Sequence, residues 1–359
     1  MDLSTGTPGR GRIPLYPLRF EPIYEYRPWG GRRLGRLLGG PLPDGPVGEA
    51  WVLSDRDDHP SRVADGLLKG LTIAQLMEDD PEQMMGRLVG RFARFPLLLK
   101  FLDVRQMLSV QVHPSDSDAA FLPAGETGKT EAWVVIRAGA SSRVYAGLRA
   151  GTTPGDLRQA LADGDVEGCL SSFIPARGEA VLVPAGTVHS LGGDIVVLEV
   201  QQNSDVTFRL YDWDHLDPRT GELRPLQVDQ ALACIDQRQS ARGPVAPGLE
   251  ATTPGRRERL IACDQFGVWR LHGDSPFSVG ATGVPRVLVC LEGAGAIDHG
   301  GASSAIGRGD VLLLPAVLGQ CVVRPRGAIT LLEIAIPDEL SRDQPPAAHG
   351  PGDSKARRP

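Results

Sequence analysis

Two histidines, a glutamate and a glutamine occur along the chain in a pattern that suits metal binding. Gln111 and His113 lie two residues apart at the end of an apolar run that begins at Phe95, so on a strand both side chains would point to the same face. Glu131 lies in the segment Lys-Thr-Glu-Ala-Trp, and His189 ends the segment Pro-Ala-Gly-Thr-Val-His. Two imidazoles, a carboxylate and an amide oxygen suit a borderline divalent metal with room left for a substrate oxygen. The spacing therefore predicts a metal site.

The elements that position these residues are expected to be short strands. The 359 residues include 44 Gly and 30 Pro, which favours many strands and tight turns over a helical bundle. Helical spacing occurs over 72–88, with Thr72 as N-cap and an interruption at Pro81, over 153–162 and, as a short turn, near 166–173. The other apolar segments, roughly ten residues apart, predict an antiparallel sandwich or barrel with strands over 48–54, 96–102, 107–113, 131–136, 178–184, 195–202 and 207–213.

A repeated pattern divides the chain into two parts. Residues 178–185 read Gly-Glu-Ala-Val-Leu-Val-Pro-Ala, residues 309–316 read Gly-Asp-Val-Leu-Leu-Leu-Pro-Ala, and an apolar-Glu-apolar strand follows each. Where the first copy continues to His189, the second reads Val-Leu-Gly, with no ligand. We therefore expect a mainly β protein with two cupin-type (jelly-roll) β-barrel domains and a few short helices. Its expected parts are a disordered N-terminus over 1–13, a catalytic metal-binding domain over 14–236, a linker over 237–256, a C-terminal domain without a metal site over 257–338 and a disordered tail over 339–359.

The overall composition indicates a globular protein and argues against several kinds of binding partner. Hydrophobic residues make up 41% of the chain and charged residues 23%, which is ordinary for a soluble globular protein. The net charge of −6 and the scattered basic residues argue against a nucleic-acid or anionic-membrane partner. Five cysteines without a Cys-x-x-Cys pair favour reduced thiols. No apolar run has the length of a signal peptide core or a membrane span, so we expect a cytoplasmic protein, either a monomer or a small homo-oligomer.

Four motifs, in order along the chain, carry a resemblance to a known family. They are Gln-Val-His-Pro from Gln111, Lys-Thr-Glu-Ala-Trp from Lys129, Pro-Ala-Gly-Thr-Val-His ending at His189, and Glu-Val-Gln-Gln-Asn-Ser-Asp-Val-Thr-Phe-Arg-Leu-Tyr-Asp from Glu199. Together they resemble the type I mannose-6-phosphate isomerases in their short bacterial form, over about 18–236 and more loosely beyond. The family's Lys-Pro-Glu reads Lys-Thr-Glu here, which leaves both the lysine and the glutamate in place.

The resemblance implies a ligand set, a reaction and a group of catalytic candidates. One zinc ion per chain would be held by Gln111, His113, Glu131 and His189, although the same ligands would also take cobalt, manganese or nickel. The implied reaction interconverts mannose 6-phosphate and fructose 6-phosphate by moving a proton between C2 and C1 through a cis-enediol. The charged residues available within family-like motifs are Lys100, Lys129, Asp205 and Arg209, and the identity of the base stays open.

Other interpretations of the same residues are kept beside this one. Arg209 and Asp205 could form a plain surface ion pair, and Lys100 could be a snorkelling lysine. At the level of function, the alternatives are an isomerase of another aldose phosphate, an Fe(II) cupin dioxygenase built on the two histidines and the glutamate, and a non-catalytic sugar-binding cupin. The cations Lys129 and Arg209 beside an intact ligand set favour a phosphorylated sugar as the substrate.

Overall fold

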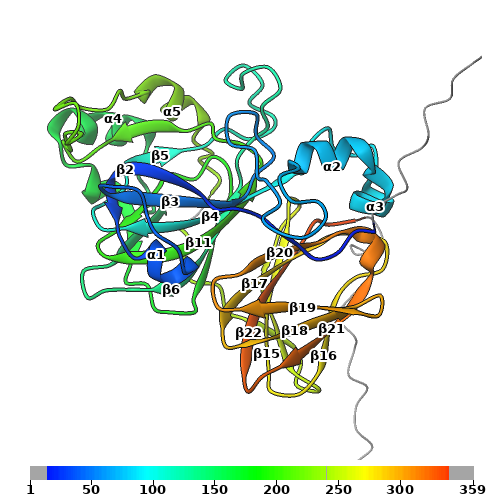
Figure 1. Ribbon diagram of the computed structural model, residues 1–359. Helices are drawn as coiled ribbons and strands as arrows, with labels where there is room; N and C mark the ends of the chain where they lie inside the picture. Colours follow the sequence, from blue (N-terminus) through cyan, green and yellow to red (C-terminus); the bar gives the residue numbers. More distant parts are fainter. Residues whose placement is uncertain (1–13, 240, 339–359) are drawn as a thin grey trace, which may run out of the picture.

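The computed structural model describes residues 14–239 and 241–338 and shows two β-rich halves (Figure 1). Each half contains two sheets, and every pairing between named strands of the described chain is antiparallel. The mainly β fold with a few short helices is therefore confirmed. The disorder predicted for 1–13 and 339–359 falls outside the described residues.

The N-terminal half consists of a six-stranded and a five-stranded sheet joined by an apolar layer that includes Leu102, Trp133 and Leu191. The larger sheet has the order β2-β3-β4-β11-β6-β9, with β2 (Ile23–Gly31), β3 (Val47–Leu53), β4 (Leu97–Val104), β11 (Ile195–Gln202), β6 (Glu131–Arg137) and β9 (Ala180–Val183). The smaller sheet has the order β12-β5-β10-β7-β8, with β12 (Phe208–Tyr211), β5 (Val110–Val112), β10 (His189–Gly192), β7 (Arg143–Leu148) and β8 (Leu170–Phe173).

The C-terminal half repeats this two-sheet plan around a second apolar layer that includes Phe277, Leu288 and Val323. Its larger sheet has the order β1-β20-β17-β22-β15-β14-β13, with β1 (Leu18–Arg19), β20 (Val311–Leu314), β17 (Arg286–Glu292), β22 (Ile329–Ala335), β15 (Gly267–Gly273), β14 (Arg256–Ala262) and β13 (Gly248–Ala251). The smaller sheet has the order β16-β21-β18-β19, with β16 (Phe277–Gly280), β21 (Gln320–Pro325), β18 (Ala294–His299) and β19 (Ala302–Gly307).

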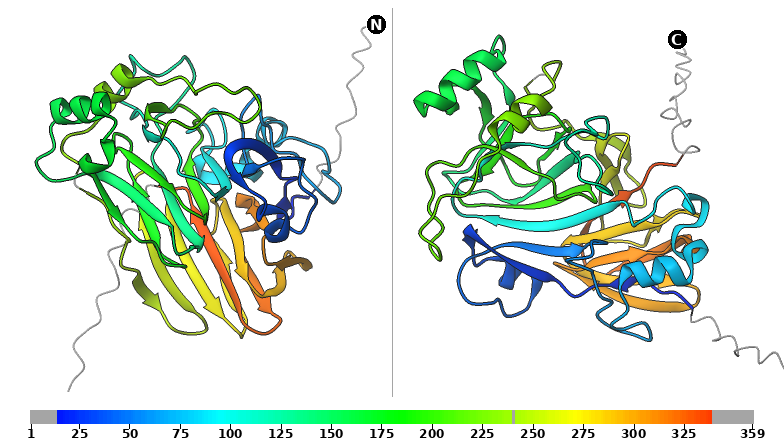
Figure 2. Two further views of the ribbon diagram at one scale, coloured as in Figure 1. Left: turned by 90° about the vertical axis from the view of Figure 1, so that its left-hand side faces the viewer. Right: turned by 90° about the horizontal axis from the view of Figure 1, so that it is seen from above.

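Two segments cross the domain limits that the sequence suggests. β1, which precedes the whole N-terminal half, pairs with β20, so Leu18 lies opposite Leu313 in the C-terminal sheet. Within the expected linker of 237–256, residues 248–251 form β13 and pair with β14, so the end of that segment is part of the C-terminal sheet. The chain start thus helps to build the second half (Figure 2).

Short helices cover the edges and ends of the sheets. Thr72 caps α2 by accepting a hydrogen bond from the backbone N–H of Gln75, whose side chain returns the contact, and Pro81 opens α3 as the first helical residue. The predicted cap and interruption are both confirmed. The helices are α1 (Leu34–Leu38), α2 (Ile73–Asp79), α3 (Pro81–Met85), α4 (Pro154–Asp163) and α5 (Val228–Cys234), with 3-10 turns η1 (Gly86–Leu88), η2 (Val166–Cys169) and η3 (Ala316–Leu318). Among the described residues, no helix has the length and apolar character needed to cross a bilayer.

Side chains alternate along β4, so its two faces pack against two different apolar clusters. Leu97, Leu99 and Phe101 belong to an apolar cluster shared with the C-terminal half, whereas Leu102 belongs to the layer inside the N-terminal half. Lys100 lies on this second, inward face. All eight residues of β4 are buried because both faces of the strand are covered.

Candidate metal centre and reaction cavity

Three strands of the N-terminal half bring the predicted ligands together. Gln111 lies in β5 and His113 directly follows it, while Glu131 and His189 are the first residues of β6 and β10. His189 lies opposite Gln111 in the β5–β10 ladder. Val112 lies between Gln111 and His113 in the sequence, and its side chain packs on the opposite side, in the outer apolar cluster under α4 and α5. The strand period therefore points both polar side chains inward.

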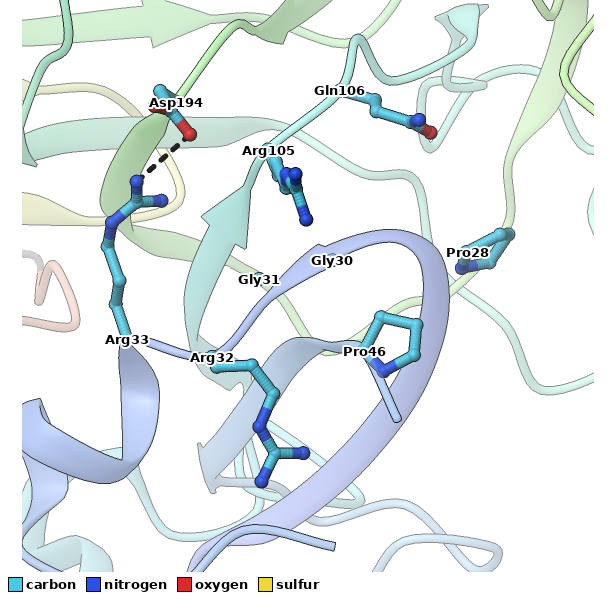
Figure 3. A pocket seen from close by; sticks show the side chains of 9 residues that line it. All are labelled: Pro28, Gly30, Gly31, Arg32, Arg33, Pro46, Arg105, Gln106 and Asp194. Atoms are coloured by element: carbon cyan, nitrogen blue, oxygen red, sulfur yellow. Dashed lines mark hydrogen bonds and ion pairs between the residues drawn. The ribbon is translucent and has the colours of Figure 1, made fainter. Parts of the chain in front are cut away.

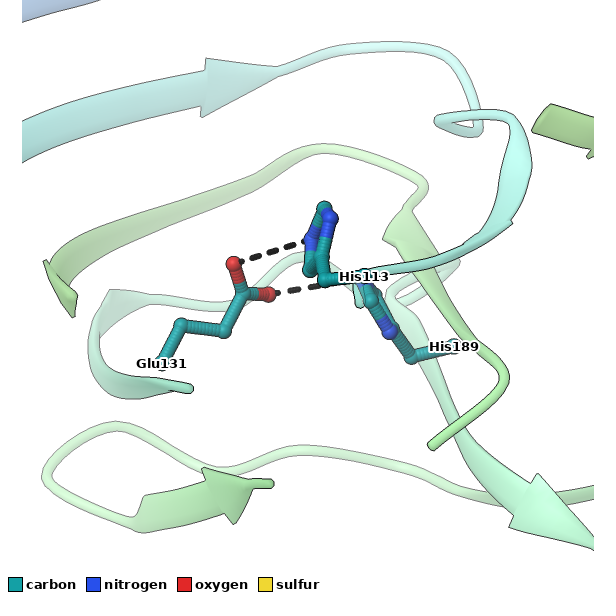
Figure 4. Close-up of side chains that lie close together, drawn as sticks. All are labelled: His113, Glu131 and His189. Atoms are coloured by element: carbon teal, nitrogen blue, oxygen red, sulfur yellow. Dashed lines mark ion pairs between the residues drawn. The ribbon is translucent and has the colours of Figure 1, made fainter. Parts of the chain in front are cut away.

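The side chains of His113, Glu131 and His189 converge on one point (Figure 4). Their ligand atoms lie within 4.8 Å of one another, and no other such group of three His, Cys, Asp or Glu residues occurs in the described chain. Nε2 of His113 lies 3.3 Å from Oε2 of Glu131, and Nε2 of His189 lies 3.4 Å from Oε1. All three residues are at most 1% exposed, so water does not solvate their polar atoms from outside.

Hydrogen bonds behind the two imidazoles aim unprotonated nitrogens at this point. Nδ1 of His113 lies 2.9 Å from the carbonyl oxygen of Val206, and Nδ1 of His189 lies 2.8 Å from that of Thr187. A carbonyl oxygen only accepts, so each Nδ1 must donate, and each Nε2 keeps its lone pair. These lone pairs face the Glu131 carboxylate, whose Oε2 also lies 3.0 Å from Nζ of Lys129. A cation at the centre of these acceptors would resolve their repulsion, so the residues fit a divalent metal.

The amide of Gln111 fits the same ion as a fourth donor. Its nitrogen lies 3.2 Å from Nε2 of His189, and its oxygen lies 3.1 Å from the Ser109 hydroxyl. Because a hydroxyl can both donate and accept, exchanging the amide oxygen and nitrogen leaves the contact with Ser109 satisfied. The amide can thus present its oxygen to a cation without losing its anchor.

Burial and nearby charges keep these side chains in the protonation states that bind metal. Burial, together with the charge of Lys129, lowers the pKa of His113 to about 3, and burial also lowers the pKa of His189. Burial raises the pKa of Glu131, but Lys129, His113 and His189 together outweigh burial and hold that pKa well below its usual value. At neutral pH both imidazoles are neutral and the carboxylate is ionised, as ligation requires.

Lys129 lies at the metal centre itself. Its Nζ is 3.0 Å from Oε2 of Glu131 and 3.3 Å from Nε2 of His113, and its side chain is 5% exposed. Burial alone would lower the pKa of Lys129, but the Glu131 carboxylate raises it above the ordinary value. The site therefore contains a fixed ammonium group beside the ligands.

A cavity of about 500 Å³ adjoins the centre, and Gln111 and all four predicted catalytic residues line it. Lys100 Nζ lies 3.1 Å from Oδ1 of Asp205, so the partner of Asp205 is this buried lysine. Arg209 lies opposite Gln111 in the β5–β12 ladder, and its buried Nε has no hydrogen-bond partner. Lys100 is only 3% exposed along its side chain, which excludes the snorkelling alternative.

A row of four side chains crosses the six-stranded sheet, and two of them, Lys100 and Glu199, line this cavity. Trp51 lies opposite Lys100 on β3 and β4, Lys100 lies opposite Glu199 on β11, and Glu199 lies opposite Trp133 on β6. The Trp133 indole donates to Glu199 at 3.1 Å. Burial, together with the charge of Glu131, raises the pKa of Glu199 to about 7. Each of the two charged groups that line the cavity thus lies beside a buried indole ring.

Sequence reasoning did not select Glu199, Glu49, Arg27 or Arg224, although all four line the cavity. A signal for Glu199 exists, because a lone carboxylate inside the run Val-Leu-Glu-Val can only be buried with a partner. Glu49 and Trp51 are two residues apart on β3 and so share a face. Arg224 lies in a loop after β12, where no strand period could place it.

A second, larger cavity lies elsewhere and lacks these features. It has a volume of about 810 Å³ and is bounded by the β2–α1 turn, the residues after β4 and Asp194 (Figure 3). Arg33, one of its three arginines, pairs with Asp194 at 2.9 Å. None of the predicted site residues lines it, so chemistry rather than size identifies the reaction cavity.

Comparison with known proteins gives one consistent result. Residues 18–132 match the family described as phosphomannose isomerase type I, catalytic domain. The chain is 36% identical to the mannose-6-phosphate isomerase ManA of Bacillus subtilis (strain 168), covering 85% of this chain and 94% of that protein, and 35% identical to the mannose-6-phosphate isomerase of Streptococcus mutans, covering 83% and 92%. The crystal structure of the mannose 6-phosphate isomerase from Bacillus subtilis superposes with a TM-score of 0.82 at 30% identity, covering 89% of this chain and 99% of that one. On its ligand cluster, its fold and these relatives, the chain belongs to the type I phosphomannose isomerase family, a member of the cupin-type folds.

Proposed function

We propose that this protein is a metal-dependent aldose–ketose isomerase that interconverts mannose 6-phosphate and fructose 6-phosphate through a cis-enediol. The observation that carries the proposal is the buried cluster of His113, Glu131 and His189, with Lys129 in contact, at a cavity lined by further cations. The named relatives are mannose-6-phosphate isomerases over nearly their whole length. Cations in the cavity favour a phosphorylated sugar over the apolar substrate that a dioxygenase of this fold would take.

The proposed ligands of one zinc ion are Gln111, His113, Glu131 and His189. Their mixed nitrogen and oxygen donors suit zinc and would also accept cobalt, manganese or nickel. When bound, the ion polarises the oxygens on C1 and C2 of the substrate and stabilises negative charge on the enediolate. Nδ1 of each histidine donates a hydrogen bond to a backbone carbonyl oxygen, which fixes the orientation of the two imidazoles.

The protein's own groups move the protons. A base removes the C2 proton of the open-chain aldose while the C1 carbonyl oxygen is protonated; C1 then receives a proton and the C2 hydroxyl gives one up, which leaves a ketone at C2. We assign the transfer between the carbons to Glu199, whose buried carboxyl lies in the cavity on the Trp133 indole, and the transfer at the oxygens to Lys129. A carboxyl that titrates near neutral pH is well matched to both halves of this exchange.

The remaining charged residues are proposed to hold the substrate and open its ring. Arg209, on the five-stranded side of the cavity, offers an unused donor to the phosphate. The ion pair of Lys100 with Asp205 supplies an acid and a base for opening the pyranose ring. Burial opposes ionisation of Asp205, but the charges of Lys100 and Lys129 hold its pKa below the usual value, so its carboxyl group stays ionised at neutral pH.

We place the protein in the cytoplasm, with a sugar phosphate as its partner and no nucleic acid or membrane. All five cysteines are free thiols, as expected in a reducing compartment. A monomer or a small homo-oligomer remains the expectation for its assembly.

The experiment that tests this function is a substrate panel on the zinc-loaded protein. Initial rates are measured with mannose 6-phosphate, glucose 6-phosphate, ribose 5-phosphate and unphosphorylated mannose at equal concentrations. We expect mannose 6-phosphate to give the highest kcat/KM and mannose to give at least 100-fold less, because the arginine contacts with the phosphate are lost. A higher kcat/KM with another aldose phosphate would reassign the substrate, and no turnover of any sugar would leave a sugar-binding protein.

A further inference from the structure

Glu49 contacts Trp51 and two cations that line the cavity, Arg27 and Lys100. Its Oε2 accepts a hydrogen bond from the Trp51 indole at 2.8 Å and from Nη2 of Arg27 at 3.0 Å, and it lies 3.9 Å from Nζ of Lys100. The side chain is 12% exposed and lines the reaction cavity. The two cations are thus held by one carboxylate that water hardly reaches.

The strand geometry explains why this carboxylate is fixed in place. Glu49 and Trp51 are alternate residues of β3 and share its inward face, and Lys100 lies opposite Trp51 on β4. The Lys100 ammonium stands 4.0 Å above the centre of the Trp51 ring. The ring therefore supports Lys100 from below while its indole N–H holds Glu49 at the side.

Without Glu49, Lys100 would have one strong partner left. That partner is Asp205, whose side chain is 42% exposed and belongs to the loop that follows β11. Lys100 would then lose the carboxylate on the β3 side of the cavity and keep only the one on the more exposed loop. The charge of Glu49 therefore favours the position of Nζ between the two carboxylates.

We infer that Glu49 is a positioning residue, which holds Lys100 and Arg27 on one wall of the cavity in the geometry that the isomerisation needs. It does not touch the metal ligands, and its role is to fix two cations that face the substrate. The inference rests on the proposed isomerase function, because it concerns the geometry of that reaction.

Glu25 supplies a matched control for the substitution. It also pairs with Arg27, at 3.3 Å, and it contacts His59 at 3.0 Å, but it is absent from the cavity lining. Glu25→Gln therefore removes one carboxylate from the same arginine without touching Lys100. Trp51→Phe keeps an aromatic ring beneath Lys100 but removes the N–H that orients Glu49, together with part of the buried indole.

The test measures kcat and KM for mannose 6-phosphate, zinc content and melting temperature for Glu49→Gln, Glu25→Gln and Trp51→Phe. We expect Glu49→Gln to lower kcat about 10- to 100-fold, as displaced catalytic groups do, with zinc content unchanged. Trp51→Phe should show a smaller loss of kcat in the same direction, and Glu25→Gln should match the wild type.

Three results would overturn the inference. A Glu49→Gln enzyme with wild-type kcat, a loss of kcat that only follows a loss of zinc or of folded protein, or an equal loss in Glu25→Gln would each show that Glu49 does not position Lys100. If Glu49→Gln does not fold, Trp51→Phe decides, because wild-type kcat in this variant contradicts the inference. An inactive wild type would instead refute the isomerase function, so the two failures are distinguishable.

Discussion

The two imidazoles of the metal centre owe their tautomers to backbone carbonyls rather than to each other. Val206 and Thr187 accept from the Nδ1 atoms of His113 and His189, so both lone pairs point at Glu131. Removing one of these ligands leaves too few donors for tight zinc binding. We therefore expect the loss of any one ligand to abolish tight zinc binding by the whole centre.

His189→Ala should reduce zinc content to below a tenth of the wild-type level and lower kcat at least 1,000-fold. The hydrogen bond to Thr187 is lost with the ring, but β10 keeps its pairing with β7 and β5 through the backbone, so the far-UV circular dichroism should not change. Zinc is measured by atomic emission. A fully active variant would contradict the ligand assignment.

The low pKa of His113 also predicts how the metal-free protein responds to acid. Burial and the charge of Lys129 lower this pKa to about 3, whereas an unfolded histidine titrates near 6.5. Between these pH values His113 is protonated in the unfolded chain but not in the folded protein. Its contribution to the free energy of unfolding is therefore fully present above pH 6.5 and is lost as the pH decreases toward 3.

We expect one such histidine to cost about 2 kcal/mol of unfolding free energy between pH 7 and pH 5. Urea unfolding of the chelated wild type at both pH values should show this loss, and His113→Asn should show a smaller one. An equal loss in the variant would place the acid sensitivity on other groups.

At the scale of elements, the strand period predicted much of the site. Gln111 and His113 share a face because they are two residues apart, and the apolar runs gave the strands that hold Glu131 and His189. The period could not pair strands that are far apart in sequence. The row from Trp51 through Lys100 to Glu199 depends on β3, β4 and β11 being neighbours, which no local pattern encodes.

The contribution of β1 shows the same limit. Leu18 and Arg19 form the edge of the C-terminal sheet by pairing with β20, which lies near the other end of the described chain. The capping of α2, in contrast, was predictable because Thr72 and Gln75 are three residues apart and make the contact locally.

Thr72→Ala should lower the free energy of unfolding by about 1 kcal/mol, since it removes the side-chain acceptor for the Gln75 N–H. Helix α2 lies far from the metal ligands along the sequence, and none of its residues lines the reaction cavity. We therefore expect kcat to stay unchanged. Chemical denaturation and the isomerase assay measure the two quantities. A drop in kcat per folded molecule would mean that α2 influences the cavity.

At the scale of the whole molecule, the two halves share one large apolar cluster. Phe101 and Val200 from the six-stranded sheet belong to it together with Val287 and Leu332 from the seven-stranded sheet. Separating the halves would expose both outer sheet faces to water. The C-terminal half thus acts as a cover for the back of the sheet whose front holds the site.

The same half differs from the N-terminal half at the positions that the sequence repeat brings into correspondence. The described residues of this half contain no His, Cys, Asp or Glu group of the kind found at the metal centre. Glu333, at the repeat position of Glu199, instead accepts from Arg257 and from the backbone N–H of Gly280 at 2.6 Å each. An ion pair thus occupies the repeat position that corresponds to Glu199 of the reaction cavity.

Leu332→Ala should destabilise the whole protein by about 2–5 kcal/mol, because the residue is fully buried in the shared cluster. We expect one cooperative thermal transition, shifted to lower temperature, with zinc content at 25 °C unchanged. Two separate transitions, with only the lower one shifted, would show that the halves fold independently.

The central claim is that one metal ion, held by four residues of the N-terminal half, makes this protein an isomerase of mannose 6-phosphate. The most direct measurement is a zinc titration of the chelated protein, with bound zinc and the rate of fructose 6-phosphate formation recorded on the same samples. The claim predicts no activity without metal and a rate that rises in proportion to bound zinc until one ion is bound per chain. Full activity in the metal-free protein, or no turnover once one zinc is bound to folded chain, would contradict it.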